Sequence, residues 1–207
     1  MANKKRDGFR FIDLFAGVGG MRLAFERAHG KCVFSSEWDK FSQQTYSANF
    51  KETPHGDITQ IHERSIPKFD VLVAGFPCQP FSKSGKQMGM EETRGTLFWN
   101  IAKIIEARKP TLVLLENVRN IAGPRHIHEW KVIIKTLRDL GYRVSEDPMV
   151  VSPHLIHPEF GGRPQVRDRV FIAATRIPKG IPNFKYNIEV PSLESVKKNW
   201  DPQKWNL

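Results

Sequence analysis

A cysteine between two prolines is the residue of this chain best placed for covalent chemistry. Cys78 lies in segment 75–82, which reads Gly-Phe-Pro-Cys-Gln-Pro-Phe-Ser, directly after the apolar run 69–74. That run predicts a buried parallel strand, and α/β proteins bind ligands at the carboxyl ends of such strands. Pro77 and Pro80 restrict the backbone around the thiol. A buried structural thiol explains the position equally well, because free cysteines are among the most buried residues.

A carboxylate follows the next predicted strand. Glu116 comes directly after the apolar run 111–115, so Glu116 and Cys78 are expected to share one cleft. A glutamic acid near a thiolate suits a reaction in which sulfur adds to a ring while a ring nitrogen is protonated. The seven histidines show no context typical of a cysteine protease. A structural acid at a strand end remains the alternative for Glu116.

The first two predicted strands end in residues that suit an adenosine site. Glycines in segment 17–20 let a ligand approach the backbone at the start of a helix, although their spacing also fits a plain tight turn. Glu37 is placed to accept hydrogen bonds from ribose, Trp38 offers a flat face for a purine, and Asp57 could contact an exocyclic amine. Taken singly, these residues equally suit a solvated carboxylate, a core tryptophan and a turn-capping aspartate.

Two arginines lie two residues apart where the last predicted strand begins. Alternation along a strand would place Arg167 and Arg169 on one face. Paired guanidinium groups suit recognition of phosphate or carbonyl oxygens. Ion pairs with Asp168 or Glu159 are the alternative.

The elements that carry these residues alternate between strand and helix patterns. This order predicts an α/β fold with a mostly parallel sheet covered by helices on both faces. We expect one domain over residues 1–178 and an irregular tail, or the start of a linker, over residues 179–207. The predicted strands are residues 9–14, 31–36, 69–74, 111–115, 142–151 and 169–175.

Charge and cysteine content narrow the function classes. The 207 residues include 32 Lys and Arg against 22 Asp and Glu, a formal net charge of +10 that favours a polyanion such as nucleic acid as partner. Cys32 and Cys78 are the two cysteines, and no Cys/His spacing is typical of a metal site, so no metal is expected. The sequence shows no membrane span or signal segment, which predicts a cytoplasmic protein.

Four motifs in order closely resemble the cytosine-C5 DNA methyltransferases of bacterial restriction-modification systems. Segment 11–20 is similar to the first motif of that family, and segment 75–82 to its Pro-Cys-Gln loop. Segment 116–118 is similar to its Glu-Asn-Val motif, and segment 165–169 to its Gln-x-Arg-x-Arg motif. The resemblance implies a Rossmann-like methyltransferase fold that acts on double-stranded DNA.

The resemblance also assigns roles residue by residue. It implies that the Cys78 thiolate adds to C6 of a flipped-out cytosine, that Glu116 supports protonation at N3, and that Arg169 holds the base carbonyl with help from Arg167. Segment 82–95 is similar to the loop that closes over DNA, where Ser84, Lys86 and Arg94 could meet the backbone. The implied S-adenosylmethionine contacts are Phe15, Val18, Glu37, Trp38, Asp57, Ile58, Pro77 and Leu97.

The chain departs from the family pattern after the fourth motif. Family members continue into a target-recognition domain and then two more motifs, the last of which completes the cofactor site, and nothing here corresponds to them. We expect either a truncated enzyme or one subunit of a split enzyme whose second polypeptide supplies the remainder. The alternatives are a tRNA cytosine-C5 methyltransferase and a catalytically silent fragment that binds cofactor or DNA.

Overall fold

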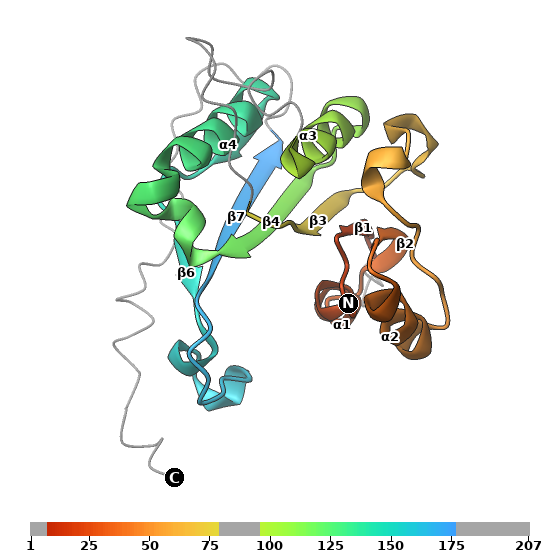
Figure 1. Ribbon diagram of the computed structural model, residues 1–207, viewed down its shortest axis with the longest axis horizontal. Coiled ribbons are helices and arrows are strands. Elements are labelled where there is room, and N and C mark those ends of the chain that lie inside the picture. The colour runs from red at the N-terminus through yellow and green to blue at the C-terminus, as the bar shows by residue number, and fades with distance from the viewer. Residues whose placement is uncertain (1–7, 79–95, 177–207) are drawn as a thin grey trace, which may run out of the picture.

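A single mixed sheet organises the chain. The computed structural model describes residues 8–78 and 96–176. Within them the strand order is β2-β1-β3-β4-β7-β5, and β6 pairs with β7 (Figure 1). The strands are β1 (Arg10–Leu14), β2 (Lys31–Ser36), β3 (Val71–Gly75), β4 (Leu112–Val118), β5 (Tyr142–Val144), β6 (Met149–Val151) and β7 (Arg169–Arg176).

The sheet has a parallel half and an antiparallel half. Strands β2, β1, β3 and β4 pair in parallel, so their carboxyl ends lie along one edge. Strand β7 runs antiparallel to β4, β5 and β6, so it starts at the edge where β4 ends. Val71 to Ala74 of β3 are buried, as expected for a strand covered on both faces. The predicted α/β, Rossmann-like fold is confirmed.

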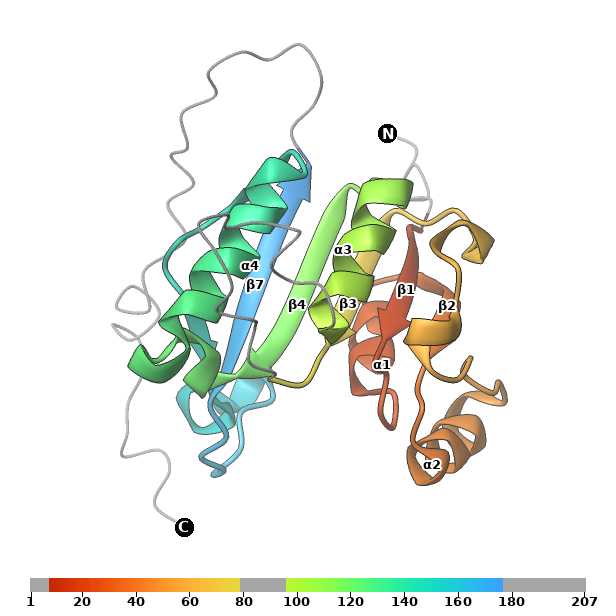
Figure 2. The same ribbon diagram turned by 45° about the horizontal axis from the view of Figure 1, so that its top comes forward.

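Helices cover both faces of the sheet. Figure 2 shows α3 (Leu97–Arg108) and α4 (Ile127–Asp139) side by side on one face. Their apolar side chains pack with Leu72, Val113 and Leu115 in the larger core. Helix α1 (Gly20–Arg27) covers the other face, and α2 (Lys40–Phe50) follows β2. Helices therefore cover both faces of the sheet, and the edge formed by the carboxyl ends of the parallel strands lies between these two helical layers.

Because side chains alternate along β1, Asp13 points to the side of the sheet that α1 covers. Ile12 and Leu14 belong to the core beneath α3 and α4, whereas Phe11 and Asp13 point toward α1. The Asp13 carboxylate accepts a hydrogen bond from the Arg22 backbone N–H at 3.2 Å. Gly19, the N-cap of α1, has no side chain with which to cap the helix. Asp13 therefore supplies from β1 part of the capping that the glycine turn lacks.

Two expected elements differ from the structure. The run 142–151 forms two strands, β5 and β6, because segment 145–148 contains a proline and forms a bend between them. Strand β7 begins at Arg169, so Arg167 lies in the preceding loop and strand alternation does not apply to it. The expected DNA-closing loop 82–95 and the tail from residue 179 lie outside the described residues. No described helix is long and apolar enough to cross a membrane.

Candidate active site

The loop after β3 holds Cys78 at the carboxyl edge of the sheet. The thiol is partly buried and packs against the larger core. Asn117, which is 2% exposed, donates from Nδ2 to the Phe76 carbonyl oxygen at 2.9 Å. The Asn117 Oδ1 accepts from the Val118 backbone N–H at 2.8 Å. The neighbouring strand thus fixes the backbone two residues before the thiol.

An acid and an arginine face each other beside this loop. Arg169 Nε lies 2.8 Å from Glu116 Oε1, and both side chains are only 23% exposed. Gly75 pairs with Glu116 across β3 and β4, and a Cβ at Gly75 would lie 3.3 Å from Glu116 Oε2. Glycine at this position therefore leaves room for the carboxylate. The structure brings Glu116, Arg169 and the cysteine loop to one edge, which the sequence predicted for Cys78 and Glu116.

The surroundings of Cys78 favour its neutral form. Desolvation by burial raises the pKa of the Cys78 thiol, and the negative charge of Glu129 on α4 raises it further. Glu129 is 4% exposed, and its Oε2 lies 3.7 Å from His126 Nδ1. Neither of these two atoms has a hydrogen-bond partner among the described residues. Nucleophilic use of Cys78 therefore requires a partner that removes the thiol proton.

Arg167 does not join Arg169. Its side chain is exposed, and its backbone N–H donates to Ser152 Oγ at 2.9 Å. The expected alternative partners are also engaged elsewhere: Asp168 forms a 2.7 Å ion pair with Arg119, and Glu159 lies 3.7 Å from a histidine. Arg169 is therefore the one of the two arginines that the described structure places beside the acid.

Glu37 connects β2 to the glycine turn. Its Oε2 accepts from the Gly17 backbone N–H at 2.7 Å, and its Oε1 accepts from the Asp39 backbone N–H at 2.8 Å. The carboxylate is 8% exposed, so it is not the solvated surface acid of the alternative interpretation. Each carboxylate oxygen has a second lone pair, which leaves capacity to accept a ribose hydroxyl.

The remaining cofactor candidates differ in how exposed they are to a ligand. Trp38 is 76% exposed, so it is not a core tryptophan and can offer its ring face to a ligand. Asp57 Oδ1 accepts from the Thr59 backbone N–H at 2.8 Å, which confirms a capping role. Ile58 is buried, so only its backbone is available there. Phe15 and Leu97 are partly buried, and Val18 and Pro77 are exposed.

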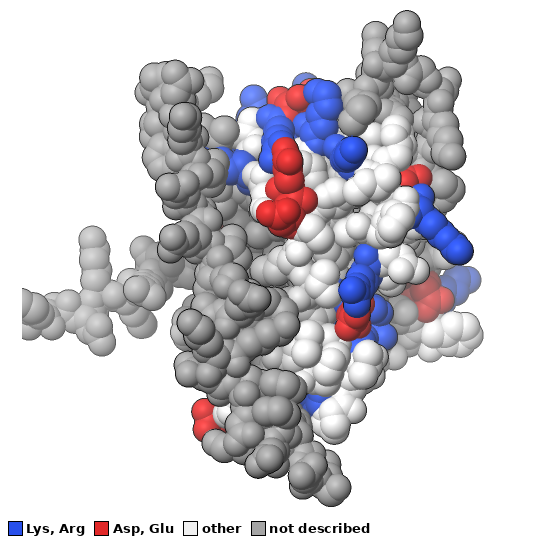
Figure 3. Space-filling model, turned by 90° about the vertical axis from the view of Figure 1, so that its left-hand side faces the viewer, with Lys and Arg blue, Asp and Glu red and all other residues white. Residues whose placement is uncertain are grey.

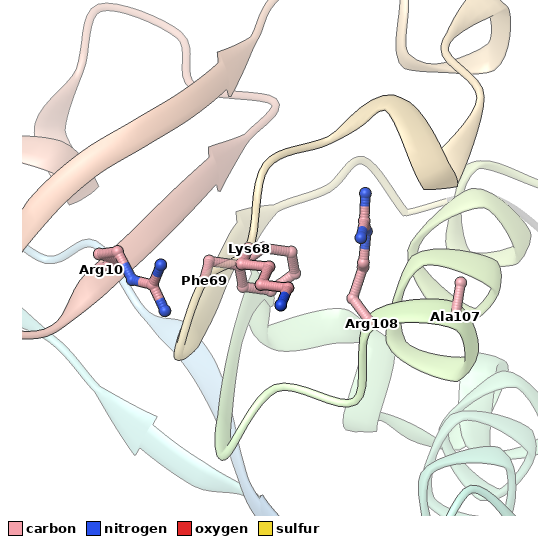
Figure 4. A pocket seen from close by; sticks show the side chains of 5 residues that line it. All are labelled: Arg10, Lys68, Phe69, Ala107 and Arg108. Carbon is pink, nitrogen blue, oxygen red and sulfur yellow. The ribbon is translucent and has the colours of Figure 1, made fainter.

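A hollow lies at the opposite edge of the sheet. It encloses about 320 Å³ and is lined by Arg10, Lys68, Phe69, Ala107 and Arg108 (Figure 4). Arg10 pairs with Asp70 at 3.4 Å, and the Arg108 guanidinium donates to backbone carbonyls. Its cationic groups are thus largely engaged, and it lies at the amino ends of β1 and β3. We assign no catalytic role to this hollow.

Acidic and basic groups are mixed over one broad face. Figure 3 shows basic and acidic side chains beside one another on the side where α4 lies in Figure 1. The net charge of +10 therefore does not form one continuous basic stripe on the described part of that face. Among the described residues, no cluster of histidine, cysteine and acidic side chains is suited to hold a metal ion.

The sequence model of the C-5 cytosine-specific DNA methylase family matches residues 9–206. The chain belongs to this family. It is similar to the Type II methyltransferase M.AluI of Cellulosimicrobium cellulans, with 51% identity over 184 residues that cover 86% of this chain and 35% of the relative. It is 45% identical to the Type II methyltransferase M.HhaI of Haemophilus parahaemolyticus over 89% of this chain and 54% of the relative. The chain therefore spans about a third to a half of these relatives.

Solved structures confirm the fold of this member of the family. The Spodoptera frugiperda DNMT2 mutant E260A/E261A/K263A aligns with a TM-score of 0.65 at 22% identity, over 87% of this chain and 54% of that chain. The S. pombe Dnmt2 methyltransferase aligns with a TM-score of 0.60 at 22% identity, over 84% of this chain and 50% of that chain. At this identity the likeness concerns the fold alone.

The C-5 cytosine methylase family uses S-adenosylmethionine, and the residues present fit that cofactor. A Cβ on Gly17, which has a φ of +53°, would meet no atom within 4 Å, so the turn has open space in front of it. The buried Glu37 carboxylate borders this turn, and the exposed Trp38 ring follows it. These features provide a ribose acceptor, an aromatic face and an accessible backbone at the amino end of α1.

Proposed function

We propose that this chain carries the catalytic machinery for methylation of C5 of a cytosine in DNA, with Cys78 as the nucleophile. The observation that carries the proposal is the 2.8 Å pair of Glu116 and Arg169 beside the anchored cysteine loop. A protease or esterase interpretation would need a histidine partner for the thiol. A carboxylic acid and a guanidinium instead suit the N3 and O2 edge of a pyrimidine.

The reaction begins with covalent addition, because C5 of a plain cytosine is a poor nucleophile. The Cys78 thiol gives its proton to water and its sulfur bonds to C6, while N3 gains a proton that passes through Glu116. Arg169 holds the carbonyl oxygen of the base, and Arg167 helps to place the base or its phosphate. The methyl group comes from S-adenosylmethionine when that cofactor is bound. Water then takes the C5 proton and N3 returns its proton through Glu116, so the bond between sulfur and C6 breaks and Cys78 leaves as a thiolate.

The cofactor side of the site uses the turn after β1 and the end of β2. We assign ribose binding to Glu37 and purine stacking to Trp38, because one is a buried acceptor and the other an exposed ring. Asp57 and the Ile58 backbone would contact the adenine edge. Phe15, Val18, Pro77 and Leu97 complete the set that the family resemblance implies.

A mechanism-trapping base tests the proposal directly. The purified chain is mixed with S-adenosylmethionine and a duplex in which 5-fluorocytosine is mispaired, because a mispaired base costs less to extrude. A denaturation-resistant protein–DNA adduct is expected from the unmodified chain and from Cys32→Ser, but not from Cys78→Ser. An adduct that forms equally with Cys78→Ser would refute the nucleophile assignment.

Substrate class and partner are tested in the same format. We propose double-stranded DNA as substrate, since the chain belongs to a family of DNA methylases. A tRNA transcript serves as the competing substrate, and preferential methyl transfer to it would reverse the assignment. We also propose that a segment outside these 207 residues supplies sequence recognition, because the chain covers 35% and 54% of two relatives. The proposed location is the cytoplasm.

With that segment absent, weak cofactor binding and little turnover are expected from the chain alone. Robust sequence-specific methylation by these 207 residues would contradict this expectation. Binding of S-adenosylmethionine or DNA with no adduct would instead favour a catalytically silent fragment. Methyl transfer and cofactor binding are therefore measured separately.

A further inference from the structure

The segment between β6 and β7 forms a structured loop beside the candidate site. We call residues 152–168 the β6–β7 loop. It includes two short 3-10 turns, Pro153–Leu155 and Pro158–Phe160, and it extends beyond the sheet below β6 in Figure 1. It leads directly into Arg169, which pairs with Val118 of β4 and reaches Glu116. The loop thus starts and ends at the edge where the candidate catalytic groups lie.

Internal hydrogen bonds hold this loop in shape. The fully buried Ser152 accepts at Oγ from the Arg167 backbone N–H at 2.9 Å. The Arg163 backbone N–H donates to the Pro153 carbonyl at 3.0 Å. A Cβ on Gly162 would lie 1.8 Å from the Ile156 carbonyl oxygen, so the backbone there is closely packed. The side chains that the loop displays are therefore presented from a defined frame.

The loop displays aromatic, aliphatic and basic side chains to solvent. Phe160 is 81% exposed and Val166 is 80% exposed, which are the highest values among the large exposed hydrophobic residues described. Arg163 and Arg167 are also exposed, and neither forms an ion pair with a described residue. The charge of Asp168 is already balanced by Arg119 at 2.7 Å. The Arg163 guanidinium donates from Nη1 to the Gly162 carbonyl at 2.9 Å, so its charge is not balanced by an acid. An exposed ring and guanidinium groups without an ion pair on one loop are chemistry that suits nucleic acid.

We propose that the β6–β7 loop is a DNA-contact surface in which Phe160 and Arg163 bind the duplex beside the target cytosine. The inference rests on the proposed function and adds a contact between the protein and a part of the DNA other than the target cytosine. Arg163 pairs with a backbone phosphate, and Phe160 packs against an exposed base or sugar face. Charge complementarity and continuity with the Glu116–Arg169 pair favour DNA over a protein partner.

A double substitution with a matched control tests the surface. Phe160→Ser with Arg163→Gln removes one exposed ring and one exposed cation from the loop. Phe41→Ser with Arg27→Gln does the same elsewhere: Phe41 is 78% exposed on α2, which follows the far edge strand β2, and Arg27 lies in the last turn of α1. Affinity for a short fluorescent duplex is measured by anisotropy over a series of salt concentrations.

The loop variant should bind the duplex about tenfold or more weakly at low salt, since a stacked ring and a phosphate contact are both lost. The slope of log affinity against log salt should fall by about one for the lost phosphate contact. The control should stay within about twofold of the unmodified chain. Thermal unfolding should be unchanged in both, because the substituted side chains are exposed.

Three results would overturn the inference: no binding by the unmodified chain at low salt, equal binding by the loop variant, or an equal loss in the control. Loss of self-association in the loop variant with unchanged DNA affinity would assign the surface to a second copy of the chain instead. The adduct assay separates this inference from the proposed function. If the loop variant binds DNA more weakly than the unmodified chain but neither forms a Cys78 adduct, the DNA-contact surface is supported and the proposed chemistry is not. If the two proteins form the adduct equally and bind DNA equally, only the DNA-contact surface is refuted.

Discussion

Replacement of Asp13 by asparagine should change how the stability of the protein depends on pH. The Asp13 side chain is completely buried between β1 and α1, and its Oδ1 has no hydrogen-bond partner among the described residues. Burial raises the pKa of Asp13 from 3.8 to about 7, against the lowering effects of the Arg22 backbone N–H and the Arg22 charge. The nearby charge of Glu37 raises it further.

The sign of the effect follows from proton binding. The folded state binds the Asp13 proton more tightly than the unfolded state, so this carboxyl group favours folding fully below the unfolded pKa of 3.8. That contribution is lost as the pH rises through about 7. The change from 3.8 to about 7, at roughly 1.4 kcal/mol for each pH unit, corresponds to about 4 kcal/mol. A carboxamide does not ionise in this range, so Asp13→Asn removes this dependence.

Urea unfolding at several pH values measures the effect. The free energy of unfolding of Asp13→Asn minus that of the unmodified chain should rise by up to about 4 kcal/mol between about pH 4 and about pH 8. Any fixed cost of burying the amide is the same at each pH and does not affect this change. Asp70→Asn is the control with the opposite sign, because hydrogen bonds from Arg10 lower the pKa of Asp70.

A pH-independent difference for Asp13→Asn would refute the reasoning. It would mean that Asp13 is ionised at the same pH in the folded and unfolded states, despite its burial. In the Asp70 control, the variant should be less stable near neutral pH, and the deficit should shrink as the pH falls through the lowered pKa. Equal behaviour of the two variants would show that the assay reports something other than these two carboxyl groups.

Three further substitutions test individual contacts. Glu129→Gln should lower the pKa of Cys78 and speed its alkylation by iodoacetamide at a fixed pH, and an unchanged rate against pH would contradict this. Asn117→Ala should lower the free energy of unfolding by about 1–3 kcal/mol, because it leaves the buried Phe76 carbonyl without its donor, whereas a loss below about 0.5 kcal/mol would exclude that role. Arg22→Ala should cost about 1–3 kcal/mol in the same measurement, because Glu26 and Glu52 lose their ion pairs and a side chain that is 7% exposed loses its packing, and a neutral result would contradict this.

Hydrophobic runs allowed most of the sheet to be predicted from the sequence. The predicted strand 31–36 matches β2, and the runs 69–74 and 111–115 match β3 and β4 within a few residues. Val71 to Ala74 of β3 are all buried, and Leu112 to Leu115 of β4 are buried or partly buried, so both runs are apolar throughout and differ clearly from their surroundings. The run 142–151 was harder, because the bend at segment 145–148 interrupts pairing with β7. A proline in that run was the available signal.

Site residues could be identified from the sequence only where their position follows from the order of the strands. Residues whose role depends on contacts between distant elements were missed. The sequence placed Cys78 and Glu116 correctly at neighbouring strand ends, since chain order and strand parallelism determine this. It did not identify Asn117, whose side chain anchors the cysteine loop, although this residue lies in the Glu-Asn-Val segment 116–118. It also missed Glu129, because a residue on α4 approaches Cys78 only through helix packing. A charged residue in a predicted helix does not reveal how close the helix lies to another part of the chain.

The position of β7 in the sheet also bears on the order in which the chain can fold. β7 is the last described strand in the sequence, yet it lies between β4 and β5 and pairs with β6 as well. Until it has been synthesised, β4 has an open edge, β5 and β6 lack the strand they pair with, and Glu116 lacks the guanidinium of Arg169. On the ribosome, the parallel half can assemble first, but the acid of the candidate site acquires its counter-ion only when residue 169 has emerged. Pairing of β7 in the sheet and formation of the ion pair between Glu116 and Arg169 in the candidate site are therefore one folding event.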